Sequence, residues 1–409
     1  MQEIWEKGAV PKIRKCPIFP GVSATQNRGE MRGEMRRMEW KIPLARPCTA
    51  TEEIKAVVEV LESGCLSLGP RLDEFERRFA NLIGTRYAVG VNSGTSGLHL
   101  CIKALGIKEG DEVITSPFSF IASANSILYE NARPVFVDIE EESFNMDPGK
   151  ITEKVTKNTK AILVVHVFGQ SCDMDPIMKI AKKFGLAVIE DACESINATY
   201  KGRKVGSFGQ AAVFAFYPNK QMTTGEGGMI VTDNEEIYNL CKSYANQGRG
   251  KDMQWLLHER IGYNYRLSEI SSALGIAQLD KLDSLIKRRR EIARAYMEEL
   301  QGTRGIVLPK IREHNEHTWF IFPIRIIGLD RNRIIAELGK RGIASKAYFY
   351  PCIHLQPFYI EKFGYRGGDF PVSEKISNQT IVLPLYPQMG ETEIKFVTGA
   401  LKTIMEEEA

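Results

Sequence analysis

The sequence of 409 residues has little that would suggest a metal site, a disulfide framework or a membrane anchor. Its eight cysteines include no CxxC pair, and it has only six histidines. Scattered cysteines of this kind are typical of reduced thiols in a cytosolic protein. The sequence also lacks an uncharged apolar stretch long enough to cross a membrane. We therefore expect a cytoplasmic protein that binds no metal.

The excess of positive charge is small and lies in the first part of the chain. The formal net charge is +3, and residues 1–40 contain eight lysines and arginines against five glutamates. The remainder is formally neutral, which does not favour a nucleic-acid partner. Residues 1–40 also lack the apolar core of a secretory signal, and their glutamates are atypical of a transit peptide. We expect this segment to be a flexible extension without function.

Strand-like and helix-like patterns alternate along the chain to about Asp233. With 43% hydrophobic residues, a chain of this length can bury a large core and divide into two domains. The segments that carry the pattern are 52–62, 87–91, 98–105, 112–115, 121–129, 134–137, 161–167, 176–184 and 186–190. Such alternation predicts an α/β fold whose largely parallel sheet has helices on both faces.

A smaller α/β domain is predicted after the large one. Residues 267–300 have a helical pattern, in which Arg288-Arg289-Arg290 are expected on a solvated face. The later segments are 318–326, a strand, 331–342, a helix, and 350–357, a proline-rich loop. We place the large domain at residues 41–285 and the small domain at residues 286–409.

Lys220 is the most informative residue of the sequence. It lies in a turn of small residues between the apolar segments 214–216 and 229–231, which resemble short buried strands. A lysine amine attacks a carbonyl only when burial or nearby cations lower its pKa. The apolar flanks supply burial, so Lys220 is a candidate Schiff-base lysine. A single lysine is more often a surface charge, and the hypothesis therefore depends on two further segments.

The apolar, strand-like segment that begins at Ala187 ends in two adjacent carboxylates, Glu190 and Asp191. Open α/β sheets place ligands at the carboxyl ends of their strands. A pyridoxal phosphate ring needs a carboxylate at its pyridine nitrogen, because that ion pair keeps the ring protonated and able to accept electrons. Asp191 is the candidate for this carboxylate. Without Lys220 downstream, an aspartate that caps the following turn would be the simpler interpretation.

The segment Asn92-Ser93-Gly94-Thr95-Ser96-Gly97 lies between a strand-like and a helix-like run. Small residues at a helix N-terminus expose backbone N–H groups to an anion, and the helix dipole adds to the attraction. The segment is therefore a candidate phosphate-binding loop. Capping of the helix by Ser93 or Thr95 explains the same residues nearly as well.

Together, these segments resemble the pyridoxal-phosphate-dependent nucleotide-sugar aminotransferases of the DegT/DnrJ/EryC1/StrS family. The resemblance runs from about Ile42 to the C-terminus, and family members usually begin near Met38. Further motifs that carry it are 69–70, 75–76, 116–120, 124–125, 134–138, 166–169, 224–228, 262–269, 351–356 and 383–387. The resemblance implies fold type I (aspartate aminotransferase-like), with a large, mostly parallel sheet domain and a smaller C-terminal α/β domain.

The resemblance also implies how the ring of pyridoxal 5′-phosphate is held. Lys220 would bind the cofactor as a Schiff base and then move the proton between the substrate carbon and the cofactor. Asp191 would pair with the pyridine nitrogen. Phe120 would stack on the ring face.

Four residues are implied for the cofactor phosphate. Gly94, Thr95 and Ser96 would hold it with backbone amides and hydroxyls. Asn246 matches a residue that in relatives reaches the phosphate from the neighbouring subunit. The resemblance therefore implies a homodimer with shared active sites.

Two positions depart from the family pattern. Ala215 stands where many relatives have a serine that bonds the cofactor phosphate. Such a hydrogen bond contributes about 1.5–3 kcal/mol, so we expect weaker cofactor retention without loss of the chemistry. Glu194 stands where relatives often have glutamine or histidine near the cofactor 3′-oxygen, and we expect it to accept a hydrogen bond from the protonated form of that oxygen.

Two residues are candidate substrate contacts. Arg266 is a candidate for the donor carboxylate or the nucleotide, although an arginine before a helix can equally brace an interface. His354 lies in a segment that in relatives is near the substrate mouth, where it would contact sugar or diphosphate. His166 follows a buried strand and is interpreted as a core histidine.

The resemblance predicts transfer of an amino group from an amino acid, L-glutamate in the first place, to a keto group of a nucleotide-linked deoxysugar. C4 is favoured over C3, and polysaccharide biosynthesis is the expected context. Sugar dehydratases of the family replace the Schiff-base lysine by histidine, so Lys220 favours transamination. A non-enzymatic regulator on this fold is the other alternative, and it would be expected to lose Lys220 or Asp191 and to gain a basic DNA-binding segment.

Overall fold

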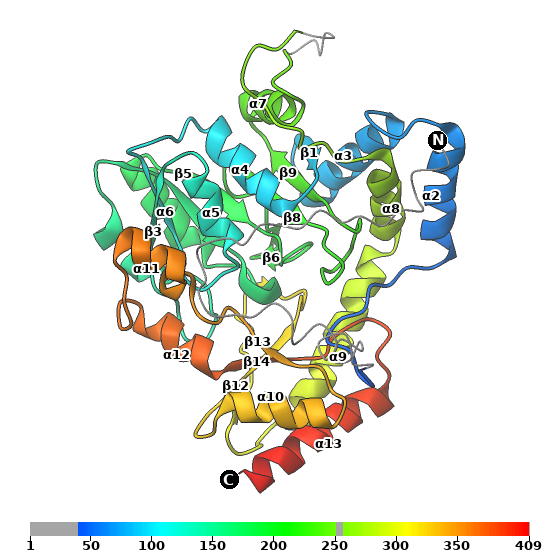
Figure 1. Cartoon of the computed structure of the whole chain (residues 1–409), viewed down its shortest axis with the longest axis vertical. Helices are drawn as coiled ribbons and strands as arrows, with labels where there is room; N and C mark the ends of the chain where they lie inside the picture. Colours follow the sequence, from blue (N-terminus) through cyan, green and yellow to red (C-terminus); the bar gives the residue numbers. More distant parts are fainter. Residues whose placement is uncertain (1–39, 251–256, 409) are drawn as a thin grey trace, which may run out of the picture. The chain divides into compact units, whose positions relative to one another are not determined.

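Seven strands form the largest sheet, in the order β1-β9-β8-β5-β4-β2-β3 (Figure 1). In the computed structural model, which describes residues 40–250 and 257–408, the neighbouring strands are parallel except at β9. β9 runs antiparallel to β1 and β8, because a turn, and not a crossover helix, joins it to β8. The strands are β1 Tyr87–Val91, β2 Glu112–Thr115, β3 Arg133–Phe136, β4 Thr159–Val165, β5 Ala187–Asp191, β8 Ala211–Ala215 and β9 Gly228–Thr232. The predicted largely parallel sheet is confirmed.

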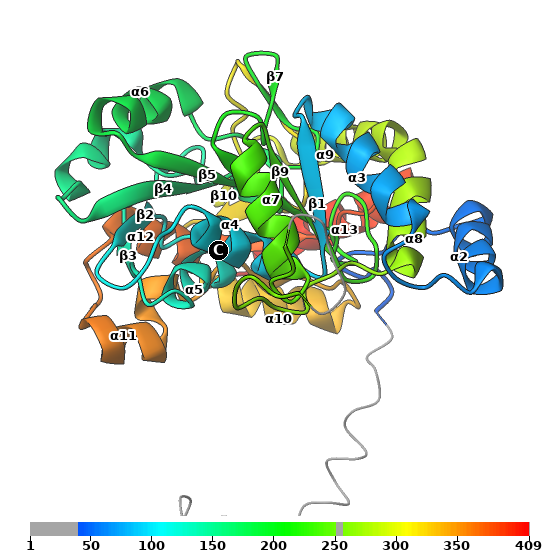
Figure 2. The ribbon, with the colours of Figure 1, turned by 90° about the horizontal axis from the view of Figure 1, so that it is seen from above.

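Helices cover both faces of this sheet (Figure 2). On β4, Ala161, Leu163 and Val165 belong to the core under α4, α5 and α7. Ile162 and Val164 alternate with them and pack with α6 on the opposite face, which α3 and α8 cover next to β8 and β9. The helices are α3 Pro70–Ile83, α4 Gly94–Ala104, α5 Ala122–Leu128, α6 Met174–Phe184, α7 Glu235–Ala245 and α8 Glu269–Asp280. Burial on both faces explains the nearly continuous apolar strands.

Glycines allow the N-terminus of α4 to lie directly against β8 and β9. A Cβ atom on Gly97 would lie 2.6 Å from Val213 Cγ1. A Cβ atom on Gly228 would lie 2.7 Å from the carbonyl carbon of Ser93. Side chains cannot occupy such distances, so the close approach of helix and strands requires glycine at both positions.

A second, antiparallel sheet has the order β10-β12-β14-β13 and packs with α9, α10 and α13. Its elements are β10 Ile306–Val307, β12 Phe322–Ile326, β13 Lys346–Ala347, β14 Thr380–Leu383, α9 Leu282–Leu300, α10 Arg331–Lys340 and α13 Glu391–Glu407. The remaining elements are α2 Thr51–Ser63, α11 Pro357–Phe363, α12 Pro371–Gln379 and the short sheet of β6 Thr199–Tyr200, β7 Arg203–Lys204 and β11 Asn315–Glu316. The domain boundary predicted at residue 285 falls inside α9, and the division into two domains stays a prediction. The flexible extension is predicted for residues 1–40, of which residues 1–39 lie outside the described part of the chain.

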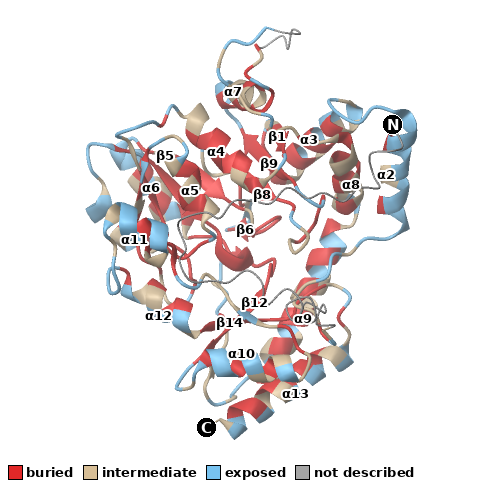
Figure 3. Ribbon diagram, viewed as in Figure 1, coloured by how far each residue is buried: buried red, intermediate tan, exposed pale blue. Residues whose placement is uncertain are grey.

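The long helix predicted over residues 267–300 is two helices, α8 and α9, which separate at Lys281. The solvated face predicted for Arg288-Arg289-Arg290 is wrong for Arg289, which is only 3% exposed. Arg289 lies one turn from Ile286 and Ala293 on the buried face of α9, while its two neighbours stay half-buried. The run of three arginines suggests exposure for all of them. The helical spacing of the apolar residues around Arg289 nevertheless indicates that this position is buried. The same division into a buried and an exposed face runs along most helices (Figure 3).

Asp138 connects the large sheet to α12. Its buried carboxylate accepts hydrogen bonds from the backbone N–H of Val372 (3.0 Å) and of Ser373 (2.8 Å) and from Ser373 Oγ (2.6 Å). Burial alone would raise the pKa of Asp138, but the hydrogen bonds from Ser373 and Val372 outweigh it and lower that pKa below 3.8. The charged form therefore stabilises the fold above the ordinary carboxyl pKa, and this stabilisation is lost as the pH falls through the folded-state pKa.

We expect Asp138→Asn to lower the free energy of unfolding by about 2 kcal/mol at pH 7, because hydrogen bonds to a charged acceptor are replaced by weaker ones. The difference from wild type should persist down to about pH 4 and shrink below it. Urea unfolding followed by circular dichroism between pH 7 and pH 3 measures both effects. Asp330→Asn, at the exposed N-cap of α10, is the control and should cost less. A cost for Asp138→Asn that does not depend on pH would contradict the role of the charge.

Candidate active site

Asp191 ends β5 and is held by a helix on one face of the sheet. Ser123 Oγ, from α5, donates a hydrogen bond to Asp191 Oδ2 at 2.7 Å, and the Cys193 N–H donates to Oδ1 at 3.2 Å. Ser119 Oγ lies 2.8 Å from Ser123 Oγ and extends this chain of hydroxyls. Asp191 is 5% exposed. The carboxylate predicted for the pyridine nitrogen is therefore buried and fixed in orientation.

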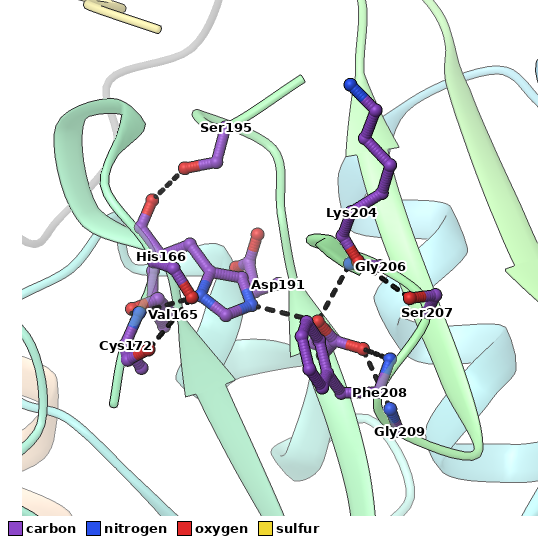
Figure 4. Close-up of polar contacts among 12 residues, drawn as sticks. Val165, His166, Cys172, Asp191, Ser195, Lys204, Gly206, Ser207, Phe208 and Gly209 are labelled. Carbon is purple, nitrogen blue, oxygen red and sulfur yellow. Dashed lines mark hydrogen bonds and ion pairs between the residues drawn. The ribbon is translucent and has the colours of Figure 1, made fainter. Parts of the chain in front are cut away.

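Glu190, which precedes Asp191, points to the opposite face and has a structural role. Its carboxylate accepts N–H hydrogen bonds from Gly206, Phe208 and Gly209 at 2.7 to 2.8 Å. His166 Nε2 lies 3.1 Å from the same carboxylate. Figure 4 shows His166 on one side of this carboxylate and the turn at residues 206–209 on the other. The two adjacent carboxylates of the sequence thus have different partners on opposite faces of the sheet.

His166 is a core histidine, as the sequence predicts. It is fully buried, and its Nδ1 accepts the N–H of Cys172 at 3.0 Å, so Nε2 carries the proton toward Glu190. The backbone N–H of His166 donates to the Asp191 carbonyl at 3.1 Å. The backbone carbonyl of His166 accepts a hydrogen bond from Ser195 Oγ at 2.6 Å (Figure 4). This network anchors the backbone on both sides of Asp191.

Lys220 lies in the turn between β8 and β9, and its side chain is 13% exposed. Its Nζ is 3.6 Å from Glu194 Oε1 and 3.9 Å from the centroid of the Phe320 ring. Glu194 Oε2 accepts the N–H of Phe168 at 3.0 Å. Burial raises the pKa of Glu194, and the nearby Lys220 amine and the Phe168 N–H offset only part of that effect. The structure thus brings together two residues predicted separately from the sequence.

The N-terminus of α4 lies against the end of β8. Ser93 caps the helix by accepting the N–H of Ser96 at 3.1 Å. A Cβ atom on Gly94 would lie 2.9 Å from both Ala215 Cβ and Cys193 Sγ. Because Cys193 follows Asp191 by two positions, the helix N-terminus, with Thr95 in its first turn, adjoins the aspartate and the β8 end. This is the arrangement that an anionic group at a helix N-terminus needs.

Phe120, Asn246 and Arg266 lie around this group. Phe120 precedes α5, its carbonyl accepts the Ser123 N–H at 3.2 Å, and its side chain is 63% exposed. Arg266 Nη1 donates to Asn246 Oδ1 at 3.0 Å, and Arg266 also forms a β-bridge with Val91, next to the start of α4. The stacking role of Phe120 and the phosphate contact of Asn246 across a subunit interface stay predictions.

His354 lies in a different environment from the group around Lys220. It is fully buried, its Nε2 lies 3.0 Å from Glu374 Oε1, and its ring packs on Phe370 with a centroid distance of 4.8 Å. Burial lowers the pKa of His354, and the nearby Glu374 carboxylate offsets only part of this decrease. The predicted contact with sugar or diphosphate stays a prediction, and it would require this side chain to turn away from Glu374.

These residues fit pyridoxal phosphate. An amine, a buried strand-end carboxylate and a helix N-terminus occur in one region, and the cradle at Gly94 has no room for a Cβ atom. Among the described residues, no group of three or more histidines, cysteines or acidic residues could hold a metal ion. The fold and the site therefore define a pyridoxal-phosphate-dependent transferase.

The chain belongs to the DegT/DnrJ/EryC1/StrS aminotransferase family, whose model matches residues 47–402. It is 40% identical over 378 residues to the spore coat polysaccharide biosynthesis protein SpsC of Bacillus subtilis, with 89% of this chain and 97% of SpsC covered. It is 37% identical over 362 residues to the GDP-perosamine synthase of Escherichia coli O157:H7, with 88% and 97% covered. The PLP-form of the putative sugar aminotransferase Spr1654 from Streptococcus pneumoniae superposes with a TM-score of 0.85 at 29% identity, with 90% and 99% covered.

The protein is therefore a pyridoxal-phosphate-dependent sugar aminotransferase of fold type I. The family, the fold class and the cofactor expected from the sequence are confirmed. Sequence reasoning missed Ser123, which binds Asp191, and Phe320, which contacts the Lys220 amine. The serines at 119 and 123 are four positions apart, but nothing in their spacing indicates which strand end they face.

We expect Ser123→Ala to weaken the binding of pyridoxal phosphate about 10-fold, because Asp191 loses a hydrogen bond that fixes its orientation. The apparent dissociation constant is measured by absorbance titration of the apoenzyme. Ser126→Ala is the matched control: its buried Oγ, on the same helix, donates to the Ser123 carbonyl at 3.0 Å and does not contact Asp191. Equal dissociation constants for the two variants would show that Ser123 does not support Asp191.

Proposed function

We propose that this aminotransferase moves the amino group of L-glutamate to the C4 keto group of a nucleotide-linked deoxysugar. The observation that carries the chemistry is the Lys220 amine, held beside Glu194 and over the Phe320 ring, with Asp191 fixed at a strand end of the same sheet. The substrate is proposed from the relatives: one is named for polysaccharide biosynthesis and another for the synthesis of GDP-perosamine. The glutamate donor and the C4 position follow from the family resemblance.

Pyridoxal phosphate, when bound, supplies an aldehyde carbon that accepts the nitrogen and a ring that withdraws electrons from the substrate carbon. In this proposal the Asp191 carboxylate keeps the ring nitrogen protonated. Gly94, Thr95 and Ser96 hold the phosphate at the N-terminus of α4, and Phe120 covers the ring.

Lys220 is the proposed attachment point and proton carrier. Its Nζ takes the proton from the amino-acid carbon in the first half of the reaction and gives a proton to the sugar carbon in the second. Glu194 holds the amine close to the site and shields it from water, because it is 6% exposed and lies 3.6 Å from Nζ. Arg266 is proposed to bind the donor carboxylate or the nucleotide.

A homodimer is proposed as the working form. One face of α2 exposes the apolar side chains of Ile54 (65% exposed), Val58 (42%) and Leu61 (53%), which recur at helical spacing. Contiguous exposed apolar faces of this kind usually mark an interface. A second copy of the chain is the proposed partner, since the expected phosphate contact by Asn246 comes from a neighbouring subunit.

A cytoplasmic location is also proposed. The seven cysteines of the described residues are all free, which agrees with reduced thiols. In the described part of the chain, no helix has the length and apolar character to span a bilayer.

We expect Lys220→Ala to lose the visible absorbance of bound cofactor and to lower turnover by roughly 10²–10⁴-fold, because the proton carrier is removed. A panel of nucleotide-linked 3-keto and 4-keto sugars is assayed with L-glutamate, and 2-oxoglutarate is measured. Asp191→Asn should keep some cofactor but lose most activity. Lys242→Ala, which removes a partly buried lysine of α7, is the control and should stay active.

The assay also separates the alternatives. Formation of 2-oxoglutarate with a 4-keto sugar supports the proposal, whereas turnover only with 3-keto sugars corrects the position. Loss of a sugar hydroxyl without 2-oxoglutarate would indicate a dehydratase. A fully active Lys220→Ala enzyme would refute the mechanism.

We expect the double variant Ile54→Glu/Val58→Glu to shift the protein from dimer to monomer, because two buried charges at an interface cost several kcal/mol. Sedimentation equilibrium measures the mass. Lys55→Glu, on an exposed side of the same helix, changes the charge outside the apolar stripe and should leave the mass unchanged. A wild-type chain that sediments as a monomer would overturn the proposed assembly.

A further inference from the structure

Arg289 is a buried guanidinium whose hydrogen-bond acceptors are main-chain carbonyls. It is 3% exposed, and burial lowers its pKa to about 10, so it remains protonated at neutral pH. Its Nη1 donates to the carbonyls of Trp319 (3.2 Å) and Phe320 (3.2 Å) and, at 3.5 Å, of Leu385. Its Nη2 donates to the carbonyl of Lys220 at 3.3 Å.

These contacts join segments that are far apart in the sequence. Arg289 belongs to α9 and Lys220 to the turn between β8 and β9. Trp319 and Phe320 precede β12, and Leu385 follows β14. Phe320 is also the residue whose ring lies 3.9 Å from Lys220 Nζ. One guanidinium therefore binds both the backbone that carries the Lys220 amine and the backbone that carries the ring beside it.

The backbone at Trp319 needs such support. Its φ angle is +49°, in the left-handed region that residues with a Cβ atom rarely adopt. The next residue, Phe320, then donates its N–H to the Phe168 carbonyl at 3.0 Å, and Phe168 in turn donates its N–H to Glu194. The strained turn thus sets the position of the ring and connects it to the carboxylate beside Lys220.

Arginine suits this position for a geometric reason. Its guanidinium is a rigid planar fork with five N–H donors, whereas a lysine ammonium is a single point at the end of a flexible chain. A buried cation is usually paired with a carboxylate, because burial of an unpaired charge is unfavourable. Exceptions to this pairing concentrate at functional sites.

We propose that Arg289 is a positioning residue for Lys220, which sets the lysine backbone and the Phe320 ring so that the amine lies where the cofactor is attached. This inference rests on the proposed role of Lys220. Arg289 lies behind the site and acts through Lys220 and Phe320.

The test compares Arg289→Lys with Arg331→Lys. Arg331 is an equally buried arginine, 3% exposed, whose Nη1 donates to the carbonyls of Ser377 (2.8 Å) and Thr380 (2.9 Å) away from Lys220. The rate constant for attachment of pyridoxal phosphate to each apoenzyme is measured by absorbance, and thermal unfolding is measured in parallel. For Arg289→Lys we expect the rate constant to fall on the order of 10-fold, since small misplacements of reacting groups are costly. We expect Arg331→Lys to lose a similar amount of stability but to react at the wild-type rate.

Steady-state kinetics with glutamate give a second measure. For Arg289→Lys, kcat should fall on the order of 10-fold while the KM for the sugar stays near wild type, because the amine is displaced and not the substrate site. Wild-type rate constants in Arg289→Lys overturn the inference, and so does a loss of rate in both variants that follows their loss of stability.

Phe320→Leu tests the same geometry without changing Arg289. Phe320→Leu should also lower the rate constant for attachment of pyridoxal phosphate. In the double variant with Arg289→Lys, the fall in this rate constant should be smaller than the product of the two single effects, because both substitutions disturb the same positioning of the Lys220 amine. Fully multiplicative effects would overturn the inference. Borohydride reduction and mass spectrometry locate the lysine to which the cofactor is attached. A label on a lysine other than Lys220 refutes the proposed function. A label on Lys220, together with wild-type attachment rate constants in the variants, refutes only the role of Arg289.

Discussion

The site depends on the close contact between the N-terminus of α4 and strands β8 and β9. Glycine at 94, 97 and 228 removes the Cβ atoms that would separate the helix from the strands. The contact brings the first-turn amides of α4 beside Ala215 and Cys193, and thereby near the end of β5 where Asp191 lies. Packing therefore places together the helix end proposed to bind the phosphate and the carboxylate proposed to bind the ring nitrogen.

The two adjacent carboxylates at the end of β5 have different partners, because successive side chains of a strand point to opposite faces of the sheet. Glu190 faces one side of the sheet, where His166 and three backbone N–H groups satisfy its charge. Asp191 faces the other side, where Ser123 and the Cys193 N–H fix it. Because buried charges are tolerated only with such partners, the first carboxylate holds the strand end in place and the second remains oriented toward the site.

The surroundings of Lys220 come from both large sheets of the molecule. Glu194 follows β5 in the first sheet, whereas Phe320 precedes β12 in the second. Arg289 connects the Lys220 backbone to that second region. The C-terminal part of the chain is therefore a structural component of the site around the Lys220 amine: it supplies the neighbouring ring and a hydrogen-bond donor to the lysine backbone.

The sequence by itself determined the alternation of strands and helices, the spans of β1 and β2 and the family, and it predicted Lys220 and Asp191 as the central pair of the site. Local patterns contain this information, because apolar periodicity and turn residues act over a few positions. Only the tertiary structure decided that Ser123 binds Asp191, that Phe320 contacts Lys220, that Arg289 is buried within a run of arginines, and that His354 pairs with Glu374. These contacts depend on how elements distant in the chain pack, and a side chain's identity does not encode its distant partner.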